Sequence, residues 1–206
     1  MAEKRNPLYM LLKLPFVYNL VQNGLATERC YTFIYDEFLQ IRPGHKVLDL
    51  GCGPAKARPW LPEDISYTGI DFNERHLETA RKLYPNDIFL SGDLGTLDME
   101  EKGQYDVVMM MGVLHHLDDY QASSVLTHIP EFLKPTGCFF AMDPVFVPGG
   151  NPIAYLAARL DQGQSVRYAD GYATLARPHF SEVASSVQSG LLKIPYTHHL
   201  LKCRAS

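Results

Sequence analysis

The sequence lacks the cysteine pattern of a metal-bound or disulfide-bonded scaffold. Its 206 residues contain four cysteines, and no two of them form a Cys-x-x-Cys pair: Cys30, Cys52, Cys138 and Cys203. Widely spaced single cysteines argue against a zinc framework and against a small disulfide-rich fold. We therefore expect four free thiols in a reducing compartment, and predict a cytoplasmic protein.

An excess of positive charge is also missing. The formal net charge is -4, and no cluster of lysine and arginine occurs along the chain. Nucleic-acid binding is therefore disfavoured, because it depends on neutralising phosphates with basic side chains. Hydrophobic residues make up 46% and charged residues 20%, a composition typical of one globular domain with a sizeable core.

No apolar run is long enough to cross a membrane. The N-terminal stretch 9–21 is interrupted by Lys13, Pro15 and Asn19, so neither a bilayer span nor a signal peptide is expected. We predict that it forms a lid or packing helix within an N-terminal helical cap, residues 1–43. Contact with a membrane surface remains an alternative, without stable insertion.

Strand-like and helix-like segments alternate along most of the chain. Strands are expected at 46–50, 67–71, 87–91, 105–111 and 137–142, with helices at 73–83 and 118–133. This alternation predicts an α/β fold: a Rossmann-like, mostly parallel seven-stranded sheet with helices on both faces. Residues 44–142 would form the cofactor-binding core, 143–180 a lid on the acceptor side with a helix, and 181–206 a final strand pair whose last strand is antiparallel.

A glycine motif follows the first expected strand, in Val47-Leu-Asp-Leu-Gly-Cys-Gly-Pro54. Gly51 and Gly53 allow a tight turn and a close approach of the backbone to a ligand. The dinucleotide pattern Gly-x-Gly-x-x-Gly is incomplete, because Lys56 stands in place of the third glycine. Asp49 would repel a pyrophosphate but can accept from an ammonium group. An NAD-dependent oxidoreductase is therefore the weaker alternative.

Carboxylates stand at the ends of three expected strands. Besides Asp49, Asp71 can accept from both ribose hydroxyls, and Asp93 can accept from an adenine amino group. Phe72 can lie against the adenine ring. Each aspartate alone is commonly a helix cap or a turn residue, but together they fit a ligand with an amine, a ribose and an adenine.

These residues resemble the core of a class I S-adenosylmethionine-dependent methyltransferase of the small bacterial, UbiE-like type. The matching segments are 48–54, 69–72, 92–94, 105–108 and Gly-Val-Leu-His-His-Leu at 112–117. The resemblance implies S-adenosylmethionine as cofactor and S-adenosylhomocysteine as product. It also implies these cofactor-binding residues: Asp49, Gly51, Cys52 and Gly53 for the methionine end, Asp71 for the ribose, Phe72, Asp93 and Leu94 for the adenine, and Met111 and His116 after the fourth strand.

Methyl transfer is a displacement at a sulfonium carbon, in which placement of the two reactants can contribute about 7–11 kcal/mol. An alcohol or phenol acceptor also needs a base, and His115 and His116 are the candidates. Alternatively, one of them caps the next helix and the other packs. Topology directs further side chains toward the acceptor: Asp143 and Tyr196 as catalytic candidates, with Arg159, Asp161, Arg167 and His198. Equally, Arg159, Asp161 and Arg167 could form an ion-pair network that holds the lid.

No metal is expected, because Asp143 has no partner at a convincing spacing. The favoured function is methyl transfer to a small molecule, with a homodimer left open. Three alternatives remain: a non-methylating S-adenosylmethionine-binding protein of the same fold, the NAD-dependent oxidoreductase, and a protein or nucleic-acid methyltransferase. The acidic charge weakens the last of these.

Overall fold

The computed structural model describes residues 28–97, 99–161 and 163–205. Its helical start, α3 (Glu28–Thr32) followed by a π-helical turn (Phe33–Phe38), belongs to the expected N-terminal cap. The stretch 9–21 and the rest of that cap lie outside the described residues. None of the described helices is long and apolar enough to cross a membrane.

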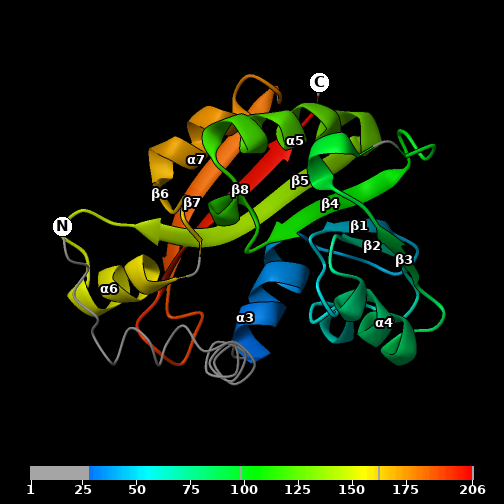
Figure 1. Ribbon diagram of the computed structural model, residues 1–206, viewed down its shortest axis with the longest axis horizontal. Helices are drawn as coiled ribbons and strands as arrows, with labels where there is room; N and C mark the ends of the chain where they lie inside the picture. The colour runs from blue at the N-terminus through cyan, green and yellow to red at the C-terminus, as the bar shows by residue number, and fades with distance from the viewer. Residues whose placement is uncertain (1–27, 98, 162, 206) are drawn as a thin grey trace.

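One sheet organises the fold (Figure 1). Along its main path the strands lie in the order β3-β2-β1-β4-β5-β8-β7, and only β8 runs antiparallel to its neighbours. The seven-stranded sheet with an antiparallel last strand is thus confirmed, and a two-residue strand, β6, pairs with β5 in addition. The strands are β1 (Lys46–Leu50), β2 (Ser66–Asp71), β3 (Ile88–Ser91), β4 (Tyr105–Met111), β5 (Leu133–Phe146), β6 (Arg167–Tyr168), β7 (Glu182–Ser189) and β8 (Thr197–Arg204).

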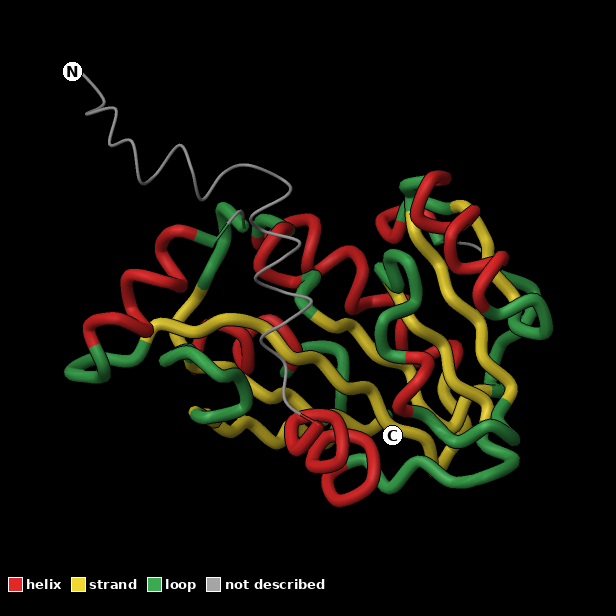
Figure 2. Tube along the Cα trace, turned by 90° about the horizontal axis from the view of Figure 1, so that it is seen from below, coloured by secondary structure: helices red, strands yellow, loops and turns green. Residues whose placement is uncertain are grey.

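Helices cover both faces of the sheet, as the alternation predicts. Figure 1 shows α5 (Asp119–Phe132) and α7 (Ala169–Ala176) on one face, with α3 and α4 (Glu74–Leu83) on the other. Figure 2 shows the red helices on either side of the yellow strands. Successive β4 residues alternate between the two hydrophobic cores, Val108 in one and Met109 in the other. Both faces of a parallel strand are therefore buried, which explains its continuous apolar run.

Side-chain caps begin the helices that the sequence predicts. The Asn73 side chain accepts from the backbone N–H of Arg75 and starts α4. The Asp118 and Gln121 side chains each accept from the other residue's backbone N–H, which forms a capping box at the start of α5. These caps set where each helix begins after the functional ends of β2 and β4.

The lid region departs from the sequence-based expectation in two ways. Helix α6 (Pro152–Leu160) was not expected; the Asn151 side chain caps it, and Pro152 occupies its first turn. Strand β5 continues beyond residue 142 to Phe146, because Asp143 pairs with His199 of β8. Asp143 is therefore held inside a strand and not in a loop after it.

The strand order reverses between β1 and β4, the place where open α/β sheets bind ligands. Parallel pairing brings Leu50, Asp71, Ser91 and Met111 to the same edge of the sheet. The expected cofactor residues all lie at this edge or in the loops that follow it.

Candidate active site

Asp49 is a buried carboxylate at the end of β1, with 2% of its surface exposed. Its Oδ2 accepts a hydrogen bond of 2.6 Å from the Tyr67 hydroxyl, whereas its Oδ1 has no hydrogen-bond partner among the described residues. Burial raises its pKa to about 7, although the bond from Tyr67 acts in the opposite direction. An oxygen in this position is suited to a cationic ligand group, which would supply the missing partner.

Asp71 joins β2 to the glycine turn. Its Oδ2 accepts from the backbone N–H of Gly53 at 2.8 Å, and its Oδ1 accepts from that of Asn73 at 2.8 Å. Gly51 and Gly53 have φ values of 77° and 55°, the left-handed region that glycine adopts at no steric cost. Each carboxylate oxygen has a second lone pair, so Asp71 can still accept from ribose hydroxyls while it fixes the turn.

The residues expected around an adenine lie at the ends of β2 and β3. Phe72 is 84% exposed, which leaves its ring free to cover a ligand. Asp93 is exposed, and its side chain accepts from the backbone N–H of Gly95, beginning a short 3₁₀ turn that includes Leu94. Leu94 packs against the core. Asp93 thus serves as a turn cap and keeps accepting capacity for a ligand.

Cys52 and Met111 lie at the same edge of the sheet but differ in how far their side chains are buried. The Cys52 side chain is buried in the core beneath the glycine turn, and burial raises the pKa of its thiol. Its backbone N–H donates to the carbonyl of Ile70, so any contact between Cys52 and a cofactor would involve its remaining main-chain atoms. Met111 is half-buried at the end of β4.

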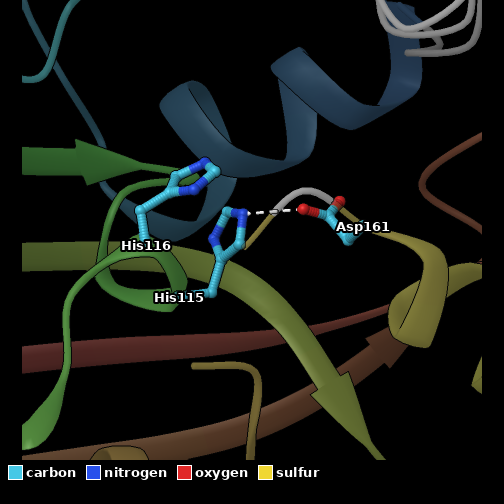
Figure 3. A group of neighbouring side chains, drawn as sticks. All are labelled: His115, His116 and Asp161. Atoms are coloured by element: carbon cyan, nitrogen blue, oxygen red, sulfur yellow. Dashed lines mark ion pairs between the residues drawn. The ribbon is translucent and has the colours of Figure 1, made fainter. Parts of the chain in front are cut away.

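His115 is held between two carboxylates. Its Nδ1 lies 2.7 Å from Asp143 Oδ1, which also accepts from the His115 backbone N–H at 3.0 Å. Its Nε2 lies 3.0 Å from Asp161 Oδ1 (Figure 3). Burial alone would lower its pKa, but contacts with Asp143 and Asp161 raise the pKa of His115 to about 9. A ring in this setting is positioned and does not reach solvent.

His116 differs from its neighbour in exposure. Its ring packs on that of His115 with centroids 4.1 Å apart, yet the residue is exposed. Burial of part of the ring and the neighbouring His115 lower its pKa. Of the two candidate bases, only His116 can therefore contact a molecule at the surface.

Tyr196 and His198 complete the group from the C-terminal strand pair. The Tyr196 hydroxyl donates to Asp161 Oδ2 at 2.8 Å. The centroids of the Tyr196 and His198 rings lie 5.0 Å apart. Burial lowers the pKa of His198 to about 4 and the pKa of His199 likewise to about 4. The structure thus brings Asp143, Tyr196 and His198 to the loop after β4, as the topological argument predicts.

Asp161 has a larger part in this group than the sequence indicated. Although burial would raise its pKa, the contact with His115 lowers the pKa of Asp161 to about 2. The next described residue, Gly163, is packed so closely that a Cβ there would lie 2.0 Å from His115 Cδ2. Tyr67, the partner of Asp49, was not singled out from the sequence, because no local pattern marks a contact that depends on strand register.

Arg167 connects the lid to the loop after β4. Its guanidinium donates to the carbonyls of Leu114 and Leu117 and to Asp119 Oδ1, and lies over the Tyr172 ring. Only 9% of its side chain is exposed. Arg167 thus pairs with Asp119, whereas Asp161 contacts His115 and Tyr196, so each ties the segment 143–180 to its surroundings through separate contacts. The ion-pair network of Arg159, Asp161 and Arg167 stays a hypothesis.

Replacing Arg167 by lysine is expected to lower the free energy of unfolding by about 1–2 kcal/mol. An ammonium group cannot reach several carbonyls in the fixed fork of a guanidinium. Thermal melting measures the change. Arg177→Lys is the matched control, since among the described residues its side chain makes a single long hydrogen bond, 3.5 Å to Thr174. Equal melting temperatures for Arg167→Lys and wild type would contradict this bracing role.

Comparison with known proteins identifies the domain that carries these residues. The family model for a methyltransferase domain matches residues 47–137, the segment that carries the glycine turn, the three carboxylates and β4. A methyltransferase of Synechocystis sp., described as uncharacterized, is 33% identical over 135 residues, which cover 63% of each chain. Residues 47–137 thus match a methyltransferase domain, which supports a class I S-adenosylmethionine-dependent methyltransferase.

Other relatives of this methyltransferase domain include the ubiquinone biosynthesis O-methyltransferase of Escherichia coli. It is 36% identical over 103 residues, which are 47% of this chain and 42% of the relative. The chain thus spans less than two thirds of the length of either curated relative.

Solved methyltransferase structures share the fold. A TehB-like S-adenosylmethionine-dependent methyltransferase from Corynebacterium glutamicum superposes with a TM-score of 0.66 at 17% identity, covering 97% of this chain and all of that one. Human N-acetylserotonin methyltransferase, solved with S-adenosylmethionine, gives a TM-score of 0.66 at 18% identity over 97% of this chain and 55% of its own. These two structures thus share the Rossmann-like fold of this chain.

Proposed function

We propose that this protein transfers the methyl group of S-adenosylmethionine to a small molecule. The observation that supports this most is the row of carboxylates at adjacent strand ends: Asp49 with an unpaired buried oxygen, Asp71 on the glycine turn, and Asp93 beyond β3. In this proposal Asp49, Gly51 and Gly53 hold the methionine end, Asp71 the ribose, and Phe72, Asp93 and Leu94 the adenine.

The acceptor would bind beside His116 and Met111, where the loop after β4 meets the lid. His116 is exposed there, whereas His115 is fixed by Asp143 and Asp161. We therefore assign His116 to contact with the acceptor and His115, Asp143 and Tyr196 to positioning. Methyl transfer by direct displacement then depends mainly on holding the acceptor oxygen or nitrogen in line with the sulfonium carbon.

The small-molecule acceptor is favoured over nucleic acid by the net charge of -4. We place the enzyme in the cytoplasm, because Cys52, Cys138 and Cys203 are buried free thiols. A reducing compartment keeps such thiols in that state. Sedimentation of the purified chain distinguishes a monomer from the homodimer that the sequence leaves open.

Isothermal titration of the purified protein with S-adenosylmethionine, S-adenosylhomocysteine and NAD tests the cofactor half of the proposal. We expect micromolar or tighter binding of the two sulfur ligands and no binding of NAD, because Asp49 would repel the pyrophosphate. If a folded protein binds neither sulfur ligand, the roles of Asp49, Asp71 and Asp93 are wrong. Binding without S-adenosylhomocysteine formation across acceptor classes would instead favour a non-methylating protein of the same fold.

A further inference from the structure

His115, His116 and Asp161 have the composition of a metal site. Each offers one ligand atom, and these atoms all lie within 4.8 Å of one another (Figure 3). Two imidazoles with one carboxylate are the ligand types of catalytic zinc and related transition metals, whereas Mg²⁺ and Ca²⁺ prefer oxygen ligands alone. We infer that these three side chains bind one divalent transition-metal ion of the zinc type at the acceptor side of the cofactor site.

The His115 Nε2 atom carries the first part of the argument. It is buried and has no hydrogen-bond partner among the described residues, although Asp161 Oδ1 lies only 3.0 Å away. The carboxylate oxygen is thus close to the ring nitrogen but outside the direction of a hydrogen bond. Ligand atoms bonded to one ion at about 2.0–2.2 Å lie roughly 3.0–3.5 Å apart, so this separation also fits two neighbouring ligands of a shared ion.

The surrounding contacts are those that support metal ligands. A metal-binding histidine usually donates its other ring N–H to a carboxylate, which fixes the tautomer. His115 has such a partner in Asp143, 2.7 Å from its Nδ1. The second oxygen of Asp161, Oδ2, accepts from the Tyr196 hydroxyl at 2.8 Å. Its Oδ1 faces His115 and also accepts from the backbone N–H of Gly163 at 3.0 Å, which fixes the carboxylate and leaves a lone pair for an ion.

His116 completes the set from the solvent side. Because it is exposed, its ring can rotate to close the remaining distance without disturbing the core. Three protein ligands leave coordination positions for water or a substrate atom. These positions would open toward the acceptor, since His115 and Asp161 occupy the buried side.

This location deepens the proposed function and rests on it for the acceptor's place. A hydroxyl oxygen bound to a divalent ion releases its proton to water more readily. The acceptor class that fits is therefore a hydroxylated small molecule whose oxygen binds the ion. His116 would then act as a ligand, and the ion would take over the activation of the acceptor.

The test is direct metal binding by tag-free protein that has been treated with a chelator. Co²⁺ is titrated and followed by its visible absorption, and Zn²⁺ is titrated by calorimetry. We expect one ion per chain with micromolar or tighter affinity. The cobalt spectrum should lack a thiolate charge-transfer band, because no cysteine belongs to the site.

Two variants and one control locate the ion. His116→Ala and Asp161→Asn should each weaken binding at least tenfold. His128→Ala, which changes a half-buried histidine of α5 outside the site, should bind as wild type does. His116→Ala keeps the test valid if Asp161→Asn melts early, because the exposed His116 ring is not needed for folding.

Absence of binding in wild type would overturn the metal site, and so would binding that His116→Ala and Asp161→Asn leave unchanged. In that case His115 is a protonated link between two carboxylates. The cofactor titration is independent of this result: S-adenosylmethionine binding without metal binding removes only the metal site, and the reverse outcome removes only the proposed function.

Discussion

Replacing Asp71 by alanine is expected to weaken S-adenosylmethionine binding at least 100-fold. In the proposed complex its carboxylate accepts from the ribose hydroxyls, and charge-assisted hydrogen bonds contribute roughly 1.5–3 kcal/mol each. The same side chain receives the backbone N–H groups of Gly53 and Asn73. Its removal would therefore also release the glycine turn that contacts the ligand. Calorimetric titration with S-adenosylmethionine and S-adenosylhomocysteine measures the loss.

Glu74→Ala is the control for Asp71→Ala, because Glu74 lies three residues farther along the chain on an exposed helix position. It should bind both ligands as wild type does. Circular dichroism establishes that each variant is folded before the titration. Wild-type affinity in folded Asp71→Ala would mean that the ribose does not lie at β2.

Replacing Asp49 by asparagine is expected to stabilise the ligand-free protein while weakening cofactor binding. Because the folded-state pKa of Asp49 is about 7, well above an unfolded value near 3.9, the folded state binds the additional proton between these values. Stability therefore falls as pH rises from about 4 through 7, and the whole cost is present above pH 7. Asparagine carries no charge and removes this cost, so the free energy of unfolding at pH 8 should rise by on the order of 2–4 kcal/mol.

Thermal melting at pH 5 and pH 8 separates this effect from a general change in packing. The Asp49→Asn variant should melt several degrees above wild type at pH 8, and the difference should shrink at pH 5. An equal difference at both pH values would show that the carboxyl charge is not its cause.

Cofactor affinity should rise with pH through the ionisation of Asp49, whereas stability falls. Wild-type affinity for S-adenosylmethionine should rise between pH 5.5 and 7, because the ligand amine stays charged there and Asp49 loses its proton. The Asp49→Asn variant should bind at least tenfold more weakly at pH 7 and show no such rise. A flat profile in wild type would place the amine away from Asp49.

The parts of the fold that the sequence predicts are those with local causes. Asn73 and Asp118 cap helices through bonds to residues two or three positions away, so the local sequence is sufficient to locate the start of both helices. The carboxylates follow strands directly, and their common edge results from parallel pairing. This is why the sequence alone groups Asp49, Asp71 and Asp93.

The acceptor side was less predictable because its contacts join distant segments. Asp161 meets His115 across 46 positions of sequence, through the course of α6 and of a strand that runs beyond its expected end. Nothing in the spacing of either residue indicates the other. The expectation of no metal was likewise drawn from Asp143 and from the pair His198-His199, whose spacing along the chain carries no information about a group such as His115, His116 and Asp161.

The close approach of Gly163 to His115 limits how the residues around His115 could change, and with them the proposed acceptor. A methyl group at position 163 would also lie 2.7 Å from the His115 carbonyl oxygen, which is a main-chain atom and cannot swing aside. Exposed residues around His116 can therefore be substituted one at a time, but Gly163, packed against His115, cannot. New acceptor specificities in related proteins should therefore arise from substitutions of the exposed residues around His116, while Gly163 and its contact with His115 are retained.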